Sequence, residues 1–153
     1  MKNLEITRYK DRLDYLFAQV AAFNNNVELQ SHWARYLCIL VSGFIETSVI
    51  VIYSEYVKQK SHAYVTNYVS SRLERFTNPK MEDILELAGK FSSDWRQQLE
   101  ITTTDEQKAA VDSIVANRNR IAHGANVGIS YDRVSKYYKN IVKVIQTIED
   151  ICC

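Results

Sequence analysis

Apolar residues in this chain recur three or four positions apart, which is the spacing of one face of an α-helix. Leu13, Phe17 and Val20 show this spacing near the start of the chain. No segment keeps the alternation of apolar and polar residues that predicts a strand. The pattern predicts helices over approximately residues 5–24, 27–60, 62–76, 78–87, 104–124 and 131–151.

Capping signals set the ends of several of these helices. Thr104 and Gln107 have the spacing of a capping box, and Gly124 is placed to end the helix that they begin. Asn78 is a cap candidate because Pro79 after it suits the first helical position. The other start signals are Asn25 with Glu28 for the second helix and Ser130 for the last.

The composition supports an all-α protein. The chain has only four glycines and one proline, which is too few for a β-domain with many tight turns. We expect one domain over residues 1–153, an antiparallel bundle of about six helices around a long central helix. Residues 91–104 are expected to be irregular, or to contain one short helical turn.

The apolar run over residues 37–53 could be mistaken for a membrane span. Glu46 lies near its centre, and a carboxylate at mid-bilayer costs roughly 2.5–3.5 kcal/mol. We therefore predict a central core helix in a protein that does not enter the membrane. Gly43 within it is a possible kink or a close-packing point.

Charge and cysteine content suggest a cytoplasmic protein without strong bulk attraction for nucleic acid. The net charge is +1, so binding to nucleic acid would need a local basic cluster. The N-terminal residues show no targeting segment, and an odd number of cysteines, three, suggests a reducing compartment. Cys38 is expected in the core, and Cys152 and Cys153 as free thiols on a frayed terminus.

The stretch VANRNRIAHGAN, residues 115–126, places polar groups where an apolar stripe finishes. Arg118 falls on the stripe one turn after Ile114, and Asn119 and His123 form an i, i+4 pair on its edge. A guanidinium there is costly unless it has a partner, with Glu46 the obvious candidate, or faces a cavity or an interface. His123 could simply complement the helix dipole.

The same stretch resembles the signature of the HEPN superfamily of small all-α proteins: an arginine, a polar residue, a few variable positions and a histidine. Arg118, Asn119 and His123 match it in order. The segments GFIETSVIVIYSEY and RFTNPKMEDILELAGKF are similar to the RiboL-PSP-HEPN subgroup. The resemblance covers about residues 33–148 and implies a HEPN-like bundle.

The resemblance implies a metal-independent endoribonuclease without a cofactor, in a toxin–antitoxin or phage-defence setting. RNA carries its own nucleophile, the 2′-hydroxyl. Arg118 would stabilise charge on the phosphate, His123 would transfer a proton, and Asn119 would assist. Relatives that have lost activity suggest the alternative, a non-catalytic module that binds RNA, a nucleotide or a protein partner.

The motif has one histidine, whereas the reaction needs a general acid and a general base. We therefore expect a homodimer that brings two motifs together. An antitoxin or defence-system protein is a further possible partner. The basic residues Arg120, Arg133 and Lys136 are candidates for binding the RNA backbone, although a solvated helix face is an equal alternative. Tyr131 and Tyr137 could stack on bases, whereas Tyr138 is better placed for the core.

Overall fold

The chain folds into helices joined by short loops. The structure, a computed structural model, describes residues 1–152, and within them it contains seven helices and no strand. The all-α prediction is confirmed, with one helix more than expected. The helices are α1 Leu4–Ala21, α2 Val27–Lys60, α3 Ala63–Leu73, α4 Met81–Phe91, α5 Ser93–Thr102, α6 Asp105–Ala122 and α7 Tyr131–Cys152.

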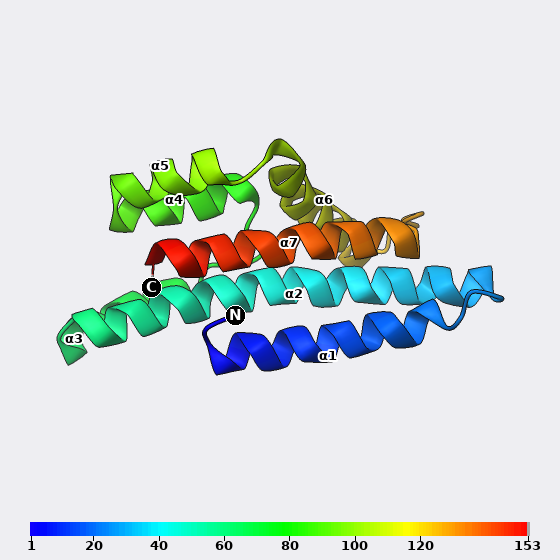
Figure 1. Cartoon of the computed structure of the whole chain (residues 1–153), viewed down its shortest axis with the longest axis horizontal. Coiled ribbons are helices and arrows are strands. Elements are labelled where there is room, and N and C mark those ends of the chain that lie inside the picture. The colour runs from blue at the N-terminus through cyan, green and yellow to red at the C-terminus, as the bar shows by residue number, and fades with distance from the viewer. Residues whose placement is uncertain (153) are drawn as a thin grey trace.

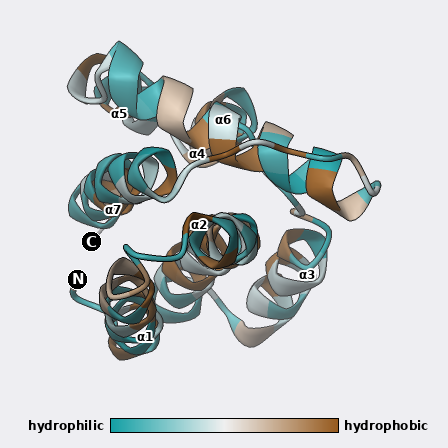
Figure 2. Ribbon diagram, turned by 90° about the vertical axis from the view of Figure 1, so that its right-hand side faces the viewer, coloured by the Kyte–Doolittle hydropathy of each residue, from teal (hydrophilic) through white to brown (hydrophobic). Residues whose placement is uncertain are grey.

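The long helix α2 is the centre of the bundle (Figure 1). It packs against α7, α1, α6 and α3. α1 runs antiparallel to α2, whereas α7 lies alongside α2 and runs in the same direction (Figure 1). α4 and α5 form a hairpin, and α6 crosses the long helices and extends beyond α2 (Figure 2). The C-terminal turn of α6 therefore sits at the margin of the bundle.

The core is built around the apolar residues of α2, as the sequence predicts. Among the described helices α2 has the length and apolarity to span a membrane, yet 56 % of its most apolar window is buried inside the fold. Leu37, Val41 and Phe44 of α2 and Ile141 and Ile145 of α7 are nearly inaccessible to solvent. The apolar run of α2 is thus explained by packing against its neighbours.

Gly43 lies at a close contact between α1 and α2. The hydroxyl of Tyr9 donates a hydrogen bond to Leu40 O at 3.1 Å, and the Tyr9 ring packs on Phe44. A Cβ at position 43 would lie 2.8 Å from the Tyr9 hydroxyl oxygen. Of the two roles considered for Gly43, the structure supports close packing.

The expectation that residues 91–104 are irregular or contain one short helical turn is wrong, because the ten-residue helix α5 occupies most of them. Ser92 caps this helix, with Oγ accepting from the backbone N–H of Trp95 at 3.4 Å. Leu99 is its one fully buried residue, so the apolar pattern is too sparse to be recognised in the sequence. The rings of Phe91 and Trp95 stack 6.1 Å apart and hold the α4–α5 corner.

Asn78 is not a helix cap, contrary to the prediction. Its φ is +46°, in the left-handed region, and its N–H donates to Glu46 Oε2 at 2.6 Å. α4 begins three residues later, where Met81 N–H donates to Asp112 Oδ1 at 2.8 Å. The second helix is also capped one residue later than expected, by Asn26.

A buried carboxylate joins the two ends of the described chain. Glu149 of α7 is only 3 % exposed, and it accepts hydrogen bonds from the backbone N–H groups of Lys2 and Asn3 at 3.0–3.2 Å. Cys152 is buried in the last turn of α7, so the expectation of a frayed end is wrong for this residue. Cys153 lies outside the described residues.

Candidate functional site

Helix α6 carries the motif and begins as the sequence predicts. Thr104 Oγ1 accepts from Gln107 N–H at 3.2 Å, and the Gln107 side chain accepts from Thr104 N–H at 3.0 Å, which completes a capping box. The buried face of α6 includes Ile114 and Val115, and Cys38 of α2 donates its thiol to Ile114 O at 3.6 Å. This face fixes the rotation of α6 about its axis and so decides where each motif residue lies.

The C-terminal end of α6 is a Schellman motif, which places His123 in solvent. Gly124 adopts φ +77°, and its N–H donates to Ile121 O at 3.0 Å. The N–H of Ala125 donates to Arg120 O at 2.9 Å, which is the second bond of the motif. His123 is therefore the last residue before the chain reverses, and its side chain is exposed.

Arg118 is half-buried and extends the apolar face of α6 toward the helix end. Its Nη1 donates to Asn119 Oδ1 at 3.3 Å. No carboxylate pairs with Arg118 in the part of the chain that the structure describes, and Glu46 is engaged by Asn78 instead. The alternative of a buried Arg118–Glu46 ion pair is thus not observed.

The three motif residues lie in the last turns of α6, where Arg118 and Asn119 are in contact. Arg118 and His123 are five positions apart, which separates their directions by about 140° around a helix. Within residues 1–152, no hydrogen bond or ion pair of the His123 ring is present. The end of α6 therefore offers a cation held by an amide and an exposed imidazole.

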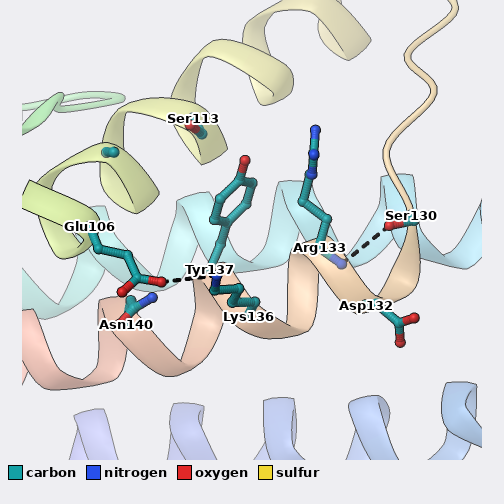
Figure 3. A pocket seen from close by; sticks show the side chains of 9 residues that line it. Glu106, Ser113, Ser130, Asp132, Arg133, Lys136, Tyr137 and Asn140 are labelled. Carbon is teal, nitrogen blue, oxygen red and sulfur yellow. Dashed lines mark hydrogen bonds and ion pairs between the residues drawn. The ribbon is translucent and has the colours of Figure 1, made fainter.

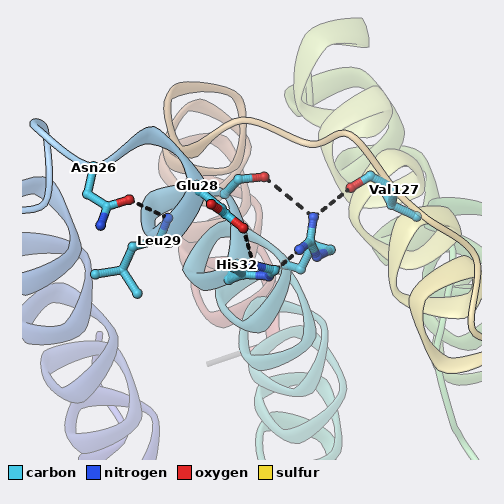
Figure 4. Close-up of polar contacts among 7 residues, drawn as sticks. Asn26, Glu28, Leu29, His32 and Val127 are labelled. Atoms are coloured by element: carbon cyan, nitrogen blue, oxygen red, sulfur yellow. Dashed lines mark hydrogen bonds and ion pairs between the residues drawn. The ribbon is translucent and has the colours of Figure 1, made fainter.

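The loop over residues 123–130 returns from α6 to α7 and is fastened to α2 (Figures 2 and 4). Val127 and Ile129 are buried anchors. Arg35 of α2 donates from Nη1 to Val127 O at 3.5 Å and contacts His32 Nδ1 through Nη2. His32 in turn lies 3.9 Å from Glu28. Because the contact spans 92 positions, no local pattern in the sequence indicates that Arg35 steadies this loop.

A groove lies between α6 and α7, on the side of α6 away from Arg118; we call it the α6–α7 groove (Figure 3). It consists of two adjoining hollows of about 450 and 330 Å³, which share Ser113, Arg133 and Tyr137. Arg120 lines the smaller hollow, and Lys136 lines the larger. The structure thus brings together the predicted basic residues Arg120, Arg133 and Lys136.

Lys136 has a partner within the groove. Its Nζ lies 3.0 Å from Glu106 Oε1, and this hydrogen bond lowers the pKa of the Glu106 carboxyl (Figure 3). Both side chains are largely exposed, so the pair contributes little to stability. The pair neutralises the charge of Lys136 at this end of the groove.

The tyrosines near the motif point in different directions. Tyr131 is not brought to the groove, since its hydroxyl donates to Phe17 O of α1 at 2.9 Å. Tyr138 belongs to the core, as predicted, and donates to Asp14 Oδ1 at 2.7 Å. Tyr137 lines both hollows. Tyr137 follows Arg133 by four residues, and this spacing places the two side chains on one face of α7.

Comparisons with known proteins agree with the resemblance seen in the sequence. Searches of curated proteins and of solved structures found no match. No group of three histidine, cysteine, aspartate or glutamate side chains is arranged for a metal ion within residues 1–152. The model of the RiboL-PSP-HEPN family matches residues 5–153, so it includes α1, which the resemblance in the sequence did not cover. The chain therefore belongs to the RiboL-PSP-HEPN family of the HEPN superfamily.

Proposed function

We propose that this protein is a metal-independent endoribonuclease that uses Arg118, Asn119 and His123. The observation that carries the proposal is the exposed end of α6. There an arginine that pairs with no carboxylate of residues 1–152 and a solvent-facing histidine stand in the order typical of HEPN ribonucleases. Family membership is compatible with activity on RNA. The alternative, a module of the same family that binds RNA without cutting it, is supported by the basic residues of the α6–α7 groove.

Each residue has a role that suits its chemistry. The 2′-hydroxyl of RNA attacks the adjacent phosphorus, its proton leaves to a base, and the 5′-oxygen departs as it gains a proton. His123 transfers a proton, since imidazole can act as base or acid near neutral pH. Arg118 stabilises the charge on the phosphate oxygens, and Asn119 holds the guanidinium in position. The products are a 2′,3′-cyclic phosphate and a free 5′-hydroxyl.

We propose a two-fold dimer as the active form. One motif supplies one imidazole, whereas the reaction needs a base and an acid. A two-fold axis beside the end of α6 would supply a second copy of each group. The separation of about 140° between the positions of Arg118 and His123 around a helix supports this arrangement. A monomer mass at micromolar concentration in light scattering or analytical ultracentrifugation would contradict it.

The test compares wild type with His123→Ala on end-labelled RNA in the presence of a chelator. His62→Ala is the matched control, since His62 is also exposed and lies at the start of α3. We expect cleavage by wild type and by the control, and a loss of at least a hundredfold in His123→Ala. Equal cleavage by all three proteins would remove the proposed role of this motif. So would cleavage at a position whose 2′-hydroxyl is replaced by hydrogen.

The proposed setting is a cytoplasmic toxin–antitoxin or phage-defence system, in which a partner protein restrains the nuclease. Induced expression of wild type should then slow growth, and His123→Ala should not. A wild-type chain that is active in vitro and harmless in cells would argue against the toxin role and leave the ribonuclease role in place.

A further inference from the structure

The two hollows of the α6–α7 groove differ in charge. The smaller hollow is lined by Arg120 and Arg133, and no aspartate or glutamate is among its lining residues. The larger hollow contains two acidic residues beside Arg133 and Lys136, so its charges balance. Both arginine side chains are exposed, and neither forms an ion pair within residues 1–152, so both guanidinium groups are available to an anion. Positive charge is therefore concentrated at the end of the groove nearest the motif.

The side chains around this charge are suited to a base as well as a phosphate. Arg133 and Tyr137 are one turn apart on α7, and both point from α7 toward α6 (Figure 3). The phenol ring of Tyr137 forms a wall common to both hollows. Asn117 also lines the smaller hollow; its Nδ2 donates to Ser113 O at 2.8 Å, and within residues 1–152 its Oδ1 accepts no hydrogen bond.

We propose that the α6–α7 groove binds one phosphate-and-base unit of a single-stranded RNA at a distance from the reacting bond. Arg120 and Arg133 hold the phosphate, Tyr137 stacks on the base, and the amide of Asn117 contacts its edge. This inference deepens the proposed function and rests on RNA being the ligand. Lys136 is not part of the proposed phosphate site, because its ammonium group already pairs with the Glu106 carboxylate.

The position of the groove on α6 separates it from catalysis. Arg120 is two residues after Arg118, which turns it about 160° away around the helix. The arginine proposed for chemistry and the arginine proposed for binding thus face opposite sides of α6. A strand that contacts both must pass over the end of the helix, where His123 and Gly124 lie. The groove therefore sets the affinity for the RNA strand and the position of that strand along the protein, and it does not touch the scissile phosphate.

The test is binding of a fluorescent 12-nucleotide RNA that is 2′-O-methylated throughout and so cannot be cut. We compare wild type with the double variant Arg120→Gln/Arg133→Gln. The control is Arg8→Gln/Arg75→Gln, which removes the same charge from exposed arginines elsewhere. We expect the groove variant to weaken Kd at least tenfold and the control less than threefold. The slope of log Kd against log salt should also fall by about 0.7 in the groove variant, because one phosphate contact is lost. Equal weakening of Kd by the groove variant and the control would contradict the proposed binding site.

Single substitutions at Tyr137 test the stacking role. Tyr137→Phe keeps the ring and should bind as wild type does, whereas Tyr137→Ala should weaken Kd roughly tenfold. Circular dichroism and the melting temperature establish that each variant is folded. Equal binding by all three proteins would overturn the stacking contact.

A free nucleotide offers the same chemistry as a unit of the strand, so adenosine monophosphate is titrated as a separate arm. Micromolar binding of the nucleotide that depends on Arg120 and Arg133, with RNA binding unchanged in the groove variant, would overturn the strand proposal. Because the RNA cannot be cut, absence of ribonuclease activity does not affect this result. If wild type does cleave unmodified RNA, the groove variant should raise KM and leave kcat within about twofold.

Discussion

Nη1 of Arg118 donates to Oδ1 of Asn119 at 3.3 Å, so the guanidinium at the end of α6 is held by its sequence neighbour, and it pairs with no carboxylate within residues 1–152. A neutral amide fixes the direction of the arginine without cancelling its charge. The other N–H groups of the fork stay available for a phosphate, which they match in geometry.

Arg118 should therefore be replaceable with little loss of stability. In a buried ion pair, removing one partner typically costs about 3–5 kcal/mol. Because Arg118 is half-buried and pairs with no described carboxylate, we expect Arg118→Ala to cost about 1 kcal/mol or less. Ile114→Ala, one turn earlier in the core, should cost about 2–5 kcal/mol. Urea unfolding of both variants measures the contrast, and comparable losses would indicate a structural role for the arginine.

Gly124→Ala should weaken the end of α6 through the backbone alone. A Cβ there would touch nothing within 4 Å, but φ is +77°, which costs a residue other than glycine about 1 kcal/mol. Gly128 is equally open and has no positive φ, so Gly128→Ala should change stability by less than about 0.5 kcal/mol. Thermal unfolding compares the two. Equal effects would mean that the left-handed cap does not hold His123 in place.

Glu149→Gln should destabilise the fold by about 1–3 kcal/mol. The amide nitrogen of glutamine is a donor and would face the backbone N–H groups of Lys2 and Asn3, which need an acceptor. Asp150→Asn is the control, since Asp150 pairs with Lys2 on the surface at 3.0 Å and both side chains are more than half exposed. Guanidinium unfolding should show a lower midpoint for Glu149→Gln alone.

Cys38 should make stability fall as the pH rises above about 9. Burial raises the pKa of its thiol from 9.0 to about 12, so the unfolded chain loses this proton first as the pH increases. The contribution is fully present below pH 9 and declines by up to about 1.4 kcal/mol per pH unit between the two pKa values. Unfolding at pH 8 and pH 10 measures it for wild type and Cys38→Ala. The variant should show a shallower decline, and parallel declines would contradict the assignment.

Much of the fold follows from local patterns that the sequence displays. The capping box at Thr104, the cap at Ser130 and the glycine motif that ends α6 each depend on residues at most five positions apart. α5 was missed because a single buried leucine cannot reveal a periodicity. Asn78 was misassigned because its conformation is set by Glu46, which lies 32 positions away and accepts its N–H.

The candidate site likewise has one part that local sequence patterns reveal and another that depends on how the helices pack. Arg118, Asn119 and His123 could be found because the motif is local to one helix end, and their catalytic role stays a prediction. The grouping of Arg120 with Arg133 depends on how α6 and α7 pack, which the sequence does not state. Tyr131 illustrates the limit, because it lies two positions before Arg133 yet turns toward α1.

The Glu149 carboxylate gives the nascent chain a late step in its folding. Its hydrogen bond to Lys2 N–H joins residues 147 positions apart, so it cannot form until α7 has left the ribosome. Until then α1 can pair with α2, but the side of α2 that α7 will cover remains open and apolar. Ribosome-bound chains that end before α7 should accordingly bind chaperones that recognise exposed apolar helices, and release from them should coincide with emergence of the last helix.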